Sequence, residues 1–369
     1  MGADVRIAFL DTNQLDYTAD TPYRQPLGGS QSAICYLAVE LAQLGHEVAV
    51  LNATTTPGWH RGVQFLNLAR IPADLPPRFE VVVVLNWARG LRLHSQLGIR
   101  APLVLWLSHA ADRPVVAALA EPQERDGWSG FAFVSEWQRE RYIEQFGIPR
   151  DKARVQRNAI SPAFAETPLE PAWFEHGEQP VLVYTSTPFR GLDVLLLAFR
   201  TIRKEIPQLR LRVFSSMAIY QVTAAQDEYR HLYAQCLADG VDYRGPLGQT
   251  RLAQELRGVA GLAYPSTYAE TSCIAVLEAM AAGAFIFTTS LGALPETTNG
   301  FGYLVDPEPD PHILAERFAA MTIKAWHELG SDPAAALRRR EAQARFVRER
   351  YRWSDRAAEW VSWLEQIVR

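Results

Sequence analysis

The sequence predicts an α/β protein built from two doubly wound, Rossmann-like domains. Short runs of Val, Ile, Leu and Phe alternate with longer segments of helical periodicity along the chain, a pattern typical of βαβ units. The chain has 369 residues, whereas a single domain usually has roughly 100–200. The alternation also lapses once near the middle, which indicates a boundary between two domains.

In the first half, five apolar runs are nearly continuous, as expected for parallel strands that are buried on both faces. We expect these strands at Val5–Leu10, Glu47–Leu51, Val81–Leu85, Leu103–Leu107 and Phe131–Val134. Helical periodicity covers Ser30–Leu44 and Ser135–Phe146. The second helix opens with a capping-box signature and ends at Gly147, so its limits are the better marked of the two.

The segment 161–180 holds four prolines and no sustained period, so we expect the interdomain linker there. The first domain is then 1–165 and the second is 166–353. The strands expected in the second domain are Val181–Thr185, Leu209–Phe214, Gly240–Tyr243, Gly261–Tyr264 and Ala284–Thr288.

The chain closes with a helix over 354–369, for which Ser354 is the expected N-cap. Trp353, Trp360 and Trp363 recur near helical spacing, which predicts that this helix packs back onto the first domain.

The composition excludes several classes of protein. Apolar residues make up 48% and charged residues 21%, as in ordinary globular chains, and the net charge of −4 gives no basic surface for nucleic acid. The three cysteines are far apart, which indicates neither a zinc site nor a disulfide framework. No signal-peptide pattern opens the chain and no window of about 18 residues is apolar throughout. We therefore expect a cytoplasmic enzyme and leave peripheral contact with the inner face of a membrane open.

The segment from Tyr264 to Gly283 is the most informative. Glu270 stands just before a helix expected to start at about Ser272, and Glu278 lies inside that helix among apolar residues. A helix that is apolar nearly all round is buried, and a buried carboxylate needs a partner or a ligand hydroxyl. The small residues at the helix start, Thr271, Ser272 and Cys273, leave N–H groups open to a diphosphate. The alternative is a capping role for Glu270 and a structural one for Glu278.

Arg190 follows the first strand of the second domain and precedes a helix. The helix dipole favours anions at that place, so a cationic side chain there is unfavourable on its own. A phosphate bound by Arg190 would explain its position. The alternative is an ordinary surface arginine.

Three features of the first domain follow strands. Gly28 and Gly29 permit close backbone approach to a ligand before a helix, although most glycine pairs are simply turns, and they form neither a P-loop nor a GxGxxG motif. His109 follows Leu103–Leu107, and Asn86 and Arg89 follow Val81–Leu85. Ligands of such sheets bind beyond the carboxyl ends of strands. His109 is therefore a candidate active-site residue and Asn86 and Arg89 are candidates for the acceptor side, with a structural histidine and a helix-surface arginine as the alternatives.

These residues resemble a known family. Glu270 and Glu278 are similar to the E-x7-E motif of the large retaining glycosyltransferase family of GT-B fold, often called glycosyl transferases group 1. Asn158 lies in a segment that resembles the family's Asn-Gly-Ile/Val, with Ala159 in place of glycine. The segment Gly292–Glu296 resembles its Gly-Gly-x-x-Glu loop. The similarity extends over almost the whole chain.

The resemblance implies two domains facing across a cleft and a role for each candidate residue. Glu278 would hold the donor ribose, Glu270 would bind hydroxyls of the transferred sugar, and the amides of Ser272 and Cys273 would contact the diphosphate. Arg190 would replace the family's phosphate-binding lysine. The family's further arginine is Thr185 here, so the resemblance implies a phosphate clamp that is either weaker or completed elsewhere.

The resemblance also implies that His109 touches the transferred sugar and that Gly28 and Gly29 approach the donor phosphates. The partners implied are a nucleotide-diphosphate sugar, UDP- or GDP-linked, and a hydroxyl-bearing sugar or lipid-linked acceptor. No cofactor is expected and no metal is required.

Two alternatives remain to be weighed. A phosphorylase on the same fold needs a second-domain lysine for pyridoxal phosphate, and no lysine lies between Lys204 and Lys324. A non-catalytic sugar-nucleotide-binding protein would retain the donor residues, and only an assay of donor hydrolysis separates it from an enzyme.

Overall fold

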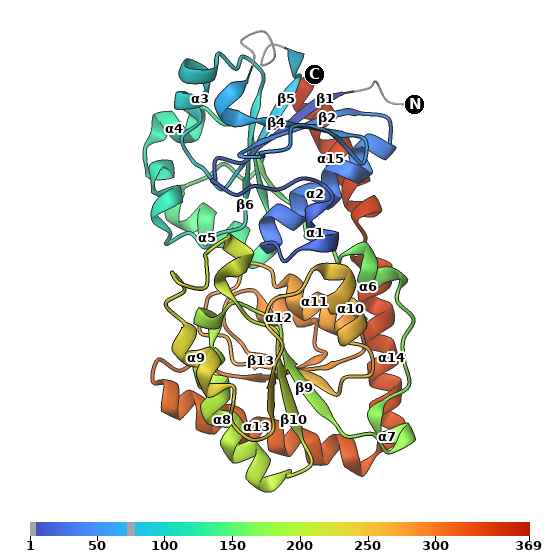
Figure 1. Ribbon diagram of the computed structural model, residues 1–369. Helices are drawn as coiled ribbons and strands as arrows, with labels where there is room; N and C mark the ends of the chain where they lie inside the picture. Colours follow the sequence, from blue (N-terminus) through green and yellow to red (C-terminus); the bar gives the residue numbers. More distant parts are fainter. Residues whose placement is uncertain (1–4, 72–77) are drawn as a thin grey trace. The chain divides into compact units, whose positions relative to one another are not determined.

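The computed structural model describes residues 5–71 and 78–369, which form two compact units (Figure 1). Among the described residues, unit 1 comprises residues 5–22, 28–71, 78–159 and 353–369. Unit 2 comprises residues 23–27 and 160–352. The chain therefore leaves unit 1 at Ala159, earlier than the boundary at 165 that the sequence predicts, and returns to it at Trp353.

Unit 1 contains an eight-stranded sheet in the order β3-β4-β2-β1-β5-β6-β7-β8. Neighbouring strands are parallel, except that β3 and β4 form an antiparallel hairpin. The strands are β1 (Arg6–Leu10), β2 (Glu47–Asn52), β3 (Gly58–His60), β4 (Val63–Asn67), β5 (Val81–Leu85), β6 (Leu103–Leu107), β7 (Gly130–Phe133) and β8 (Ala153–Val155).

The central strands of this sheet are buried throughout, which is why continuous apolar runs encode them. Every residue of β5 and β6 is buried, and both strands have the predicted limits. By contrast, β3, β4 and β8 are partly exposed, and β3 and β8 have only three residues each, so that their sequences carry no such run. The apolar pattern accordingly does not predict them.

The helices of unit 1 connect these strands. They are α1 (Thr21–Arg24, which crosses into unit 2), α2 (Gly29–Gln43), α3 (Gly90–Leu97), α4 (Pro122–Asp126), α5 (Glu136–Phe146) and α15 (Trp353–Val368), with 3-10 turns η1 (Leu68–Arg70) and η3 (Pro114–Ala120). The predicted cap of α5 is confirmed, because the Ser135 hydroxyl accepts from the N–H of Gln138 at 3.1 Å.

Helix α15 packs against α2 (Figure 1). It begins at Trp353, so Ser354 lies inside the helix and is not its N-cap. The Trp353 ring lies 6.1 Å from that of Tyr36, and the Trp360 ring lies 5.1 Å from that of Trp106. The end of the chain therefore supplies part of the core of unit 1.

Unit 2 contains a six-stranded parallel sheet in the order β11-β10-β9-β12-β13-β14. Its strands are β9 (Val181–Tyr184), β10 (Arg210–Val213), β11 (Val241–Tyr243), β12 (Gly261–Tyr264), β13 (Phe285–Thr289) and β14 (Gly302–Val305). Its helices are α6 (Pro162–Glu166), α7 (Trp173–His176), α8 (Leu192–Glu205), α9 (Arg230–Gln235), α10 (Gln249–Glu255), α11 (Ile274–Ala281), α12 (Leu294–Thr298), α13 (Pro311–Ser331) and α14 (Pro333–Arg350), with 3-10 turns η4 (Pro188–Arg190) and η5 (Met217–Tyr220).

The expectation of a plain linker at 161–180 is wrong. This segment contains α6 and α7, and Phe164 and Trp173 are buried in the core of unit 2. Pro162 occupies the start of α6, where a helix needs no N–H from that residue, and Ser161 caps the same helix. Pro162 therefore marks the start of a helix and not a linker.

Candidate functional site

In unit 2 the order of strands reverses between β9 and β12. The chain runs from β9 outward through β10 and β11, and then returns to the other side of β9 to form β12, β13 and β14. At the carboxyl ends of two such strands, the following connections run to opposite sides. The crevice between them is the usual ligand site of an open α/β sheet. Arg190 follows β9 and Glu270 follows β12, so both candidates flank this point.

Arg190 ends the turn η4, directly after β9. Gly191, with φ of 111°, follows it, and a Cβ at that position would collide with the carbonyl oxygen of Pro265. Glycine therefore lets the turn lie against the loop after β12. The guanidinium forms an ion pair with Glu270 and lies 4.3 Å from the ring centre of Tyr268. Burial alone would lower the pKa of Arg190, but Glu270 outweighs it and keeps the pKa well above the ordinary range.

Glu270 is 3% exposed and is fixed by both its backbone and its side chain. Its backbone pairs with Gly292, where a Cβ would lie 2.4 Å from the Glu270 carbonyl oxygen, so only glycine fits. The Tyr264 hydroxyl donates to the same carboxylate oxygen, Oε1, that Arg190 contacts. Burial and then the charge of Glu270 raise the pKa of Tyr264 well above its usual value. Tyr264 is therefore a neutral donor to Glu270.

Helix α11 begins at Ile274, two residues later than expected, so Thr271, Ser272 and Cys273 form the approach to the helix. Thr271 and Cys273 are buried, whereas Ser272 is half-buried. Cys273 is the N-cap residue and makes no side-chain capping hydrogen bond. Burial raises the pKa of the Cys273 thiol, which makes it a poor nucleophile.

Glu278 is buried inside α11, as the apolar surround predicts. Its Oε1 accepts from the N–H of Ser161 at 3.2 Å. The side-chain nitrogen of Gln249 donates to Oε2 at 3.2 Å and to Oε1 at 3.3 Å. Burial raises the pKa of Glu278 to about 8, against the lowering effect of these two donors. The carboxylate therefore has two neutral partners within unit 2.

Other polar groups near these strand ends were not predicted as site residues. Tyr264 and Gln249 contact the two glutamates, and the buried hydroxyls of Thr185, Thr187 and Ser215 have no hydrogen-bond partner among the residues described. Thr185, Thr187 and Ser215 follow the adjacent strands β9 and β10. Their position after a strand was the available signal, because it is the same signal that marks Arg190.

In unit 1 the strand order reverses between β1 and β5. Gly28 is the N-cap of α2 and Gly29 its first residue, with φ of −59° at Gly28. This φ is accessible to any residue, so the glycine pair is not required for a left-handed turn. What the pair leaves is a helix start without side chains at its first two positions.

The side chains of Asn86 and Ser108 form a hydrogen-bonded pair at the ends of β5 and β6. Asn86 has φ of 57° and is buried, and it donates to the Ser108 hydroxyl at 2.8 Å. The Ser108 hydroxyl lies 2.7 Å from that of Ser30, near the start of α2. The structure therefore brings Asn86 together with the helix that follows Gly28 and Gly29.

His109 follows this pair and is half-buried. Its carbonyl oxygen accepts from Gln138 at 2.8 Å and from the Tyr142 hydroxyl at 3.0 Å, so α5 fixes the backbone of His109. Arg89 is exposed at the N-cap position of α3. Within the described residues, no hydrogen bond or ion pair joins Arg89 to Asn86, so the two residues do not form one cluster.

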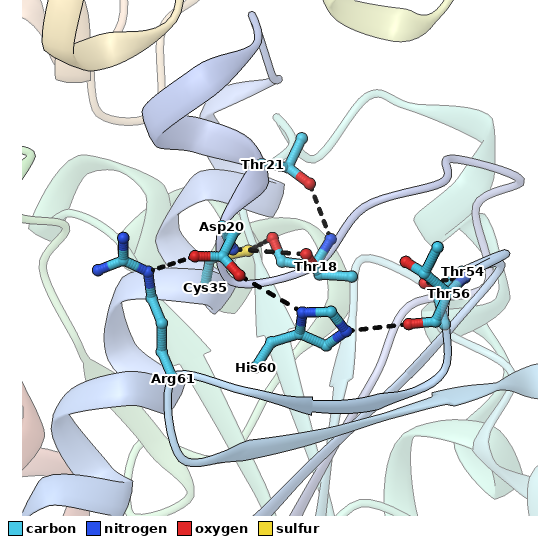
Figure 2. A network of polar contacts seen from close by, with 8 residues as sticks. All are labelled: Thr18, Asp20, Thr21, Cys35, Thr54, Thr56, His60 and Arg61. Atoms are coloured by element: carbon cyan, nitrogen blue, oxygen red, sulfur yellow. Dashed lines mark hydrogen bonds and ion pairs between the residues drawn. The ribbon is translucent and has the colours of Figure 1, made fainter.

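A further polar cluster ties the β3–β4 hairpin to the loop after β1 (Figure 2). Asp20 accepts from Nε of Arg61 at 2.8 Å and lies 3.4 Å from Nδ1 of His60. His60 also contacts the carbonyl oxygen of Thr56 through Nε2 at 3.0 Å. The cluster fixes the loop that leads toward Gly28, and no sequence motif predicts it.

Across the described ranges, 5–71 and 78–369, no group of three or more His, Cys, Asp or Glu side chains is placed to hold a metal ion. In the same ranges, no helix has the length and apolar character to cross a membrane.

Known proteins resemble this chain in sequence and in fold. Residues 179–322, all within unit 2, match the model of a family described as Glycosyl transferases group 1. A D-inositol 3-phosphate glycosyltransferase of Streptomyces avermitilis is 30% identical over 189 residues, which are 48% of this chain. The match spans 38% of that relative's length.

Solved structures extend the resemblance over both units. A glycosyltransferase from Rickettsia africae superposes with a TM-score of 0.73 at 15% identity, covering 99% of each chain. HepE of Anabaena in complex with UDP superposes with a TM-score of 0.69 at 15% identity, covering 98% of this chain and all of that one. The predicted fold class, α/β with two Rossmann-like parallel sheets of GT-B type, is confirmed.

Proposed function

We propose that this chain is a retaining glycosyltransferase that moves a hexose-type sugar from a UDP- or GDP-sugar to a hydroxyl acceptor in the synthesis of a polysaccharide, glycolipid or other glycoconjugate. The observation that carries the proposal is the cluster at the strand reversal of unit 2. There a buried carboxylate, Glu270, is bonded to Arg190 and Tyr264, four residues before the buried helix α11. The family match over 179–322 and the UDP complex of HepE support a nucleotide-sugar donor.

The donor diphosphate is assigned to Arg190 and the start of α11. A guanidinium has five N–H donors in a fixed fork, and only Nη1 of Arg190 is engaged by Glu270 in the hydrogen bonds described. The remaining donors suit phosphate oxygens. The first N–H groups of α11, near Ser272 and Cys273, add the positive end of a helix dipole.

The two glutamates are assigned to the two sugars of the donor. Glu270 would accept hydroxyl groups of the transferred hexose, and Glu278 would accept those of the ribose. Each carboxylate is held by partners that leave acceptor sites open, since a carboxylate has about four lone-pair positions. Neither residue needs to attack the sugar.

Transfer with retention is assigned to attack from the leaving-group side. The bond from the anomeric carbon to the diphosphate oxygen breaks, and the acceptor oxygen bonds to that carbon on the same face. The acceptor proton passes to the departing diphosphate, so no metal and no protein nucleophile enters the step. Arg190 and the α11 N–H groups stabilise the charge that grows on the diphosphate.

The acceptor is assigned to unit 1. Gly28 and Gly29 leave a bare helix start, and Asn86 and His109 follow neighbouring strands of one sheet. His109 would orient the transferred sugar, and Arg89 would be the outermost acceptor contact because it is exposed.

The test is to mix the purified chain with UDP-glucose and with GDP-mannose. We expect UDP or GDP to raise the melting temperature, because a ligand that binds only the folded state stabilises it. We also expect slow release of nucleoside diphosphate from one donor, with the α-anomer as the first sugar product by NMR. A protein that neither nucleotide stabilises is not a nucleotide-sugar transferase.

One observation favours a second candidate, a sugar-nucleotide-binding protein without activity. Glu270 and Glu278 both have partners inside unit 2, so their burial does not by itself require a substrate. Nucleotide binding without any turnover of donor, with the acceptor classes supplied, would support this candidate.

A further inference from the structure

The Glu278 carboxylate is held by groups from two other elements of unit 2. The N–H of Ser161, which caps α6, donates to Oε1 at 3.2 Å. The side chain of Gln249, the first residue of α10, donates to both oxygens at 3.2 and 3.3 Å. One amide nitrogen that reaches both oxygens fixes the orientation of the carboxylate. The Ser161 contact alone holds one oxygen and leaves the group free to turn about the Cγ–Cδ bond.

The partner at this place is an amide and not a cation. An arginine or lysine would neutralise the carboxylate and compete with a ligand for its lone pairs. Gln249 supplies a hydrogen bond without neutralising the charge, so Glu278 retains its capacity to accept hydroxyl groups.

Among the described residues, no charged side chain of α10, α14 or α6 contacts the Glu278 carboxylate. On α10, Arg251 and Glu255 pair with each other. On α14, Arg340 and Arg348 donate to the carbonyl oxygens of Gly283 and Ala281, at the far end of α11. Glu166 is the charged residue of α6.

We propose that Gln249 is a positioning residue, which orients the Glu278 carboxylate toward the ribose hydroxyls of the bound nucleotide. The inference rests on the proposed function. Gln249 lies outside the E-x7-E segment, and it acts through Glu278 and not on the reacting atoms. Carboxylates that bind ligands must be held to within about half an ångström, so loss of the second donor matters to binding more than to folding.

The experiment is calorimetric titration with UDP and with GDP from about pH 6 to about pH 9, a range that brackets the pKa of Glu278. Because Gln249 stabilises the charged carboxylate, Gln249→Leu raises the pKa of Glu278 further. The nucleotide needs the carboxylate, so its affinity rises with pH through that pKa. We expect Gln249→Leu to weaken binding about tenfold near pH 7, the loss of one hydrogen bond to a charged group, and to move the rise to higher pH.

The matched control is Gln254→Leu, the same change at an exposed position of the same helix. It should bind like the wild type at every pH. Gln249→Asn keeps the amide on a shorter side chain and should fall between wild type and Gln249→Leu, and it replaces Gln249→Leu if that variant does not fold.

The two levels of the argument fail differently. Wild-type protein that binds neither UDP nor GDP overturns the proposed function, and the role of Gln249 with it. Wild-type protein that binds one of them, together with a folded Gln249→Leu of equal affinity and unchanged pH profile, overturns the role of Gln249 alone.

Discussion

At the scale of single residues, the buried Glu278 couples stability to pH. Its pKa is about 8 in the folded protein and about 4.5 when exposed, so the folded state holds the proton more tightly. The stability that this preference supplies is fully present below about pH 4.5 and is lost as the pH rises through about 8.

We therefore expect Glu278→Gln to weaken this dependence. As the pH rises from about 5 to about 8, the free energy of unfolding of the variant should increase relative to that of wild type by on the order of a few kcal/mol. Urea unfolding at both pH values measures the difference. Identical pH profiles for the two proteins would show that Glu278 is not titrating in this range.

Arg190 contacts Glu270 and Tyr268 and is also the assigned phosphate clamp. We expect Arg190→Ala to lower the rate of sugar transfer by at least about 100-fold, the usual cost of one donor to a developing anion, and also to lower the melting temperature, because the buried Glu270 carboxylate loses its cation. Arg244→Ala is the control, because Arg244 is an exposed arginine that also pairs with a carboxylate, Asp242, at 2.7 Å. Full activity of folded Arg190→Ala would assign Arg190 a surface role.

His109 gives the riskiest prediction. If its imidazole orients the transferred sugar, His109→Ala should leave UDP or GDP affinity nearly unchanged, since these ligands lack that sugar. Transfer should fall by about 100-fold. A structural histidine gives the opposite pattern, with a lower melting temperature and normal activity per folded molecule, and the two measurements on one variant decide between them.

At the scale of elements, side chains of α14 complete the end of α11. Nε of Arg340 donates to the carbonyl oxygen of Gly283 at 2.9 Å, and Nη2 donates to that of Glu170 at 2.6 Å. Arg340 is 2% exposed, and burial lowers its pKa. The end of the helix that carries Glu278 therefore depends on a buried cation with carbonyl partners.

Arg340→Leu should destabilise the protein by about 2–4 kcal/mol, because the buried carbonyl group of Gly283 and the part-buried one of Glu170 lose their donor. Arg338→Leu, an exposed position of the same helix, should change stability little. Urea unfolding of both variants measures the effect. Equal stability of Arg340→Leu and wild type would mean that water replaces the guanidinium at both carbonyls.

The elements also show what sequence alone can predict. Strands buried on both faces, such as Val81–Leu85 and Gly261–Tyr264, have the predicted limits, because such strands consist of consecutive apolar residues. Contacts are different. The Arg190–Glu270 pair joins positions 80 residues apart, and the Ser161–Glu278 bond joins positions 117 apart. No local pattern encodes such distances, so Arg190, Glu270 and Glu278 could be predicted as site residues, whereas the contacts of the two glutamates could not.

At the scale of the whole molecule, each unit has its own core, and α15 belongs to unit 1. We expect calorimetry to show that UDP or GDP raises the melting transition of unit 2 and leaves that of unit 1 nearly unchanged. Removal of 353–369 should abolish the unit 1 transition and spare nucleotide binding. A truncated chain that loses nucleotide binding as well would show that the two units do not fold separately.

The place of α15 also bears on how the chain is made. Roughly 190 residues of unit 2 separate Ala159 from Trp353, and ribosomes add about 5–20 residues per second. Unit 1 therefore waits on the order of 10–40 s after its sheet has been synthesised before the helix that covers α2 emerges. The half of the protein that is translated first is completed last, and during this interval Tyr36 and Trp106 lack their partners from α15.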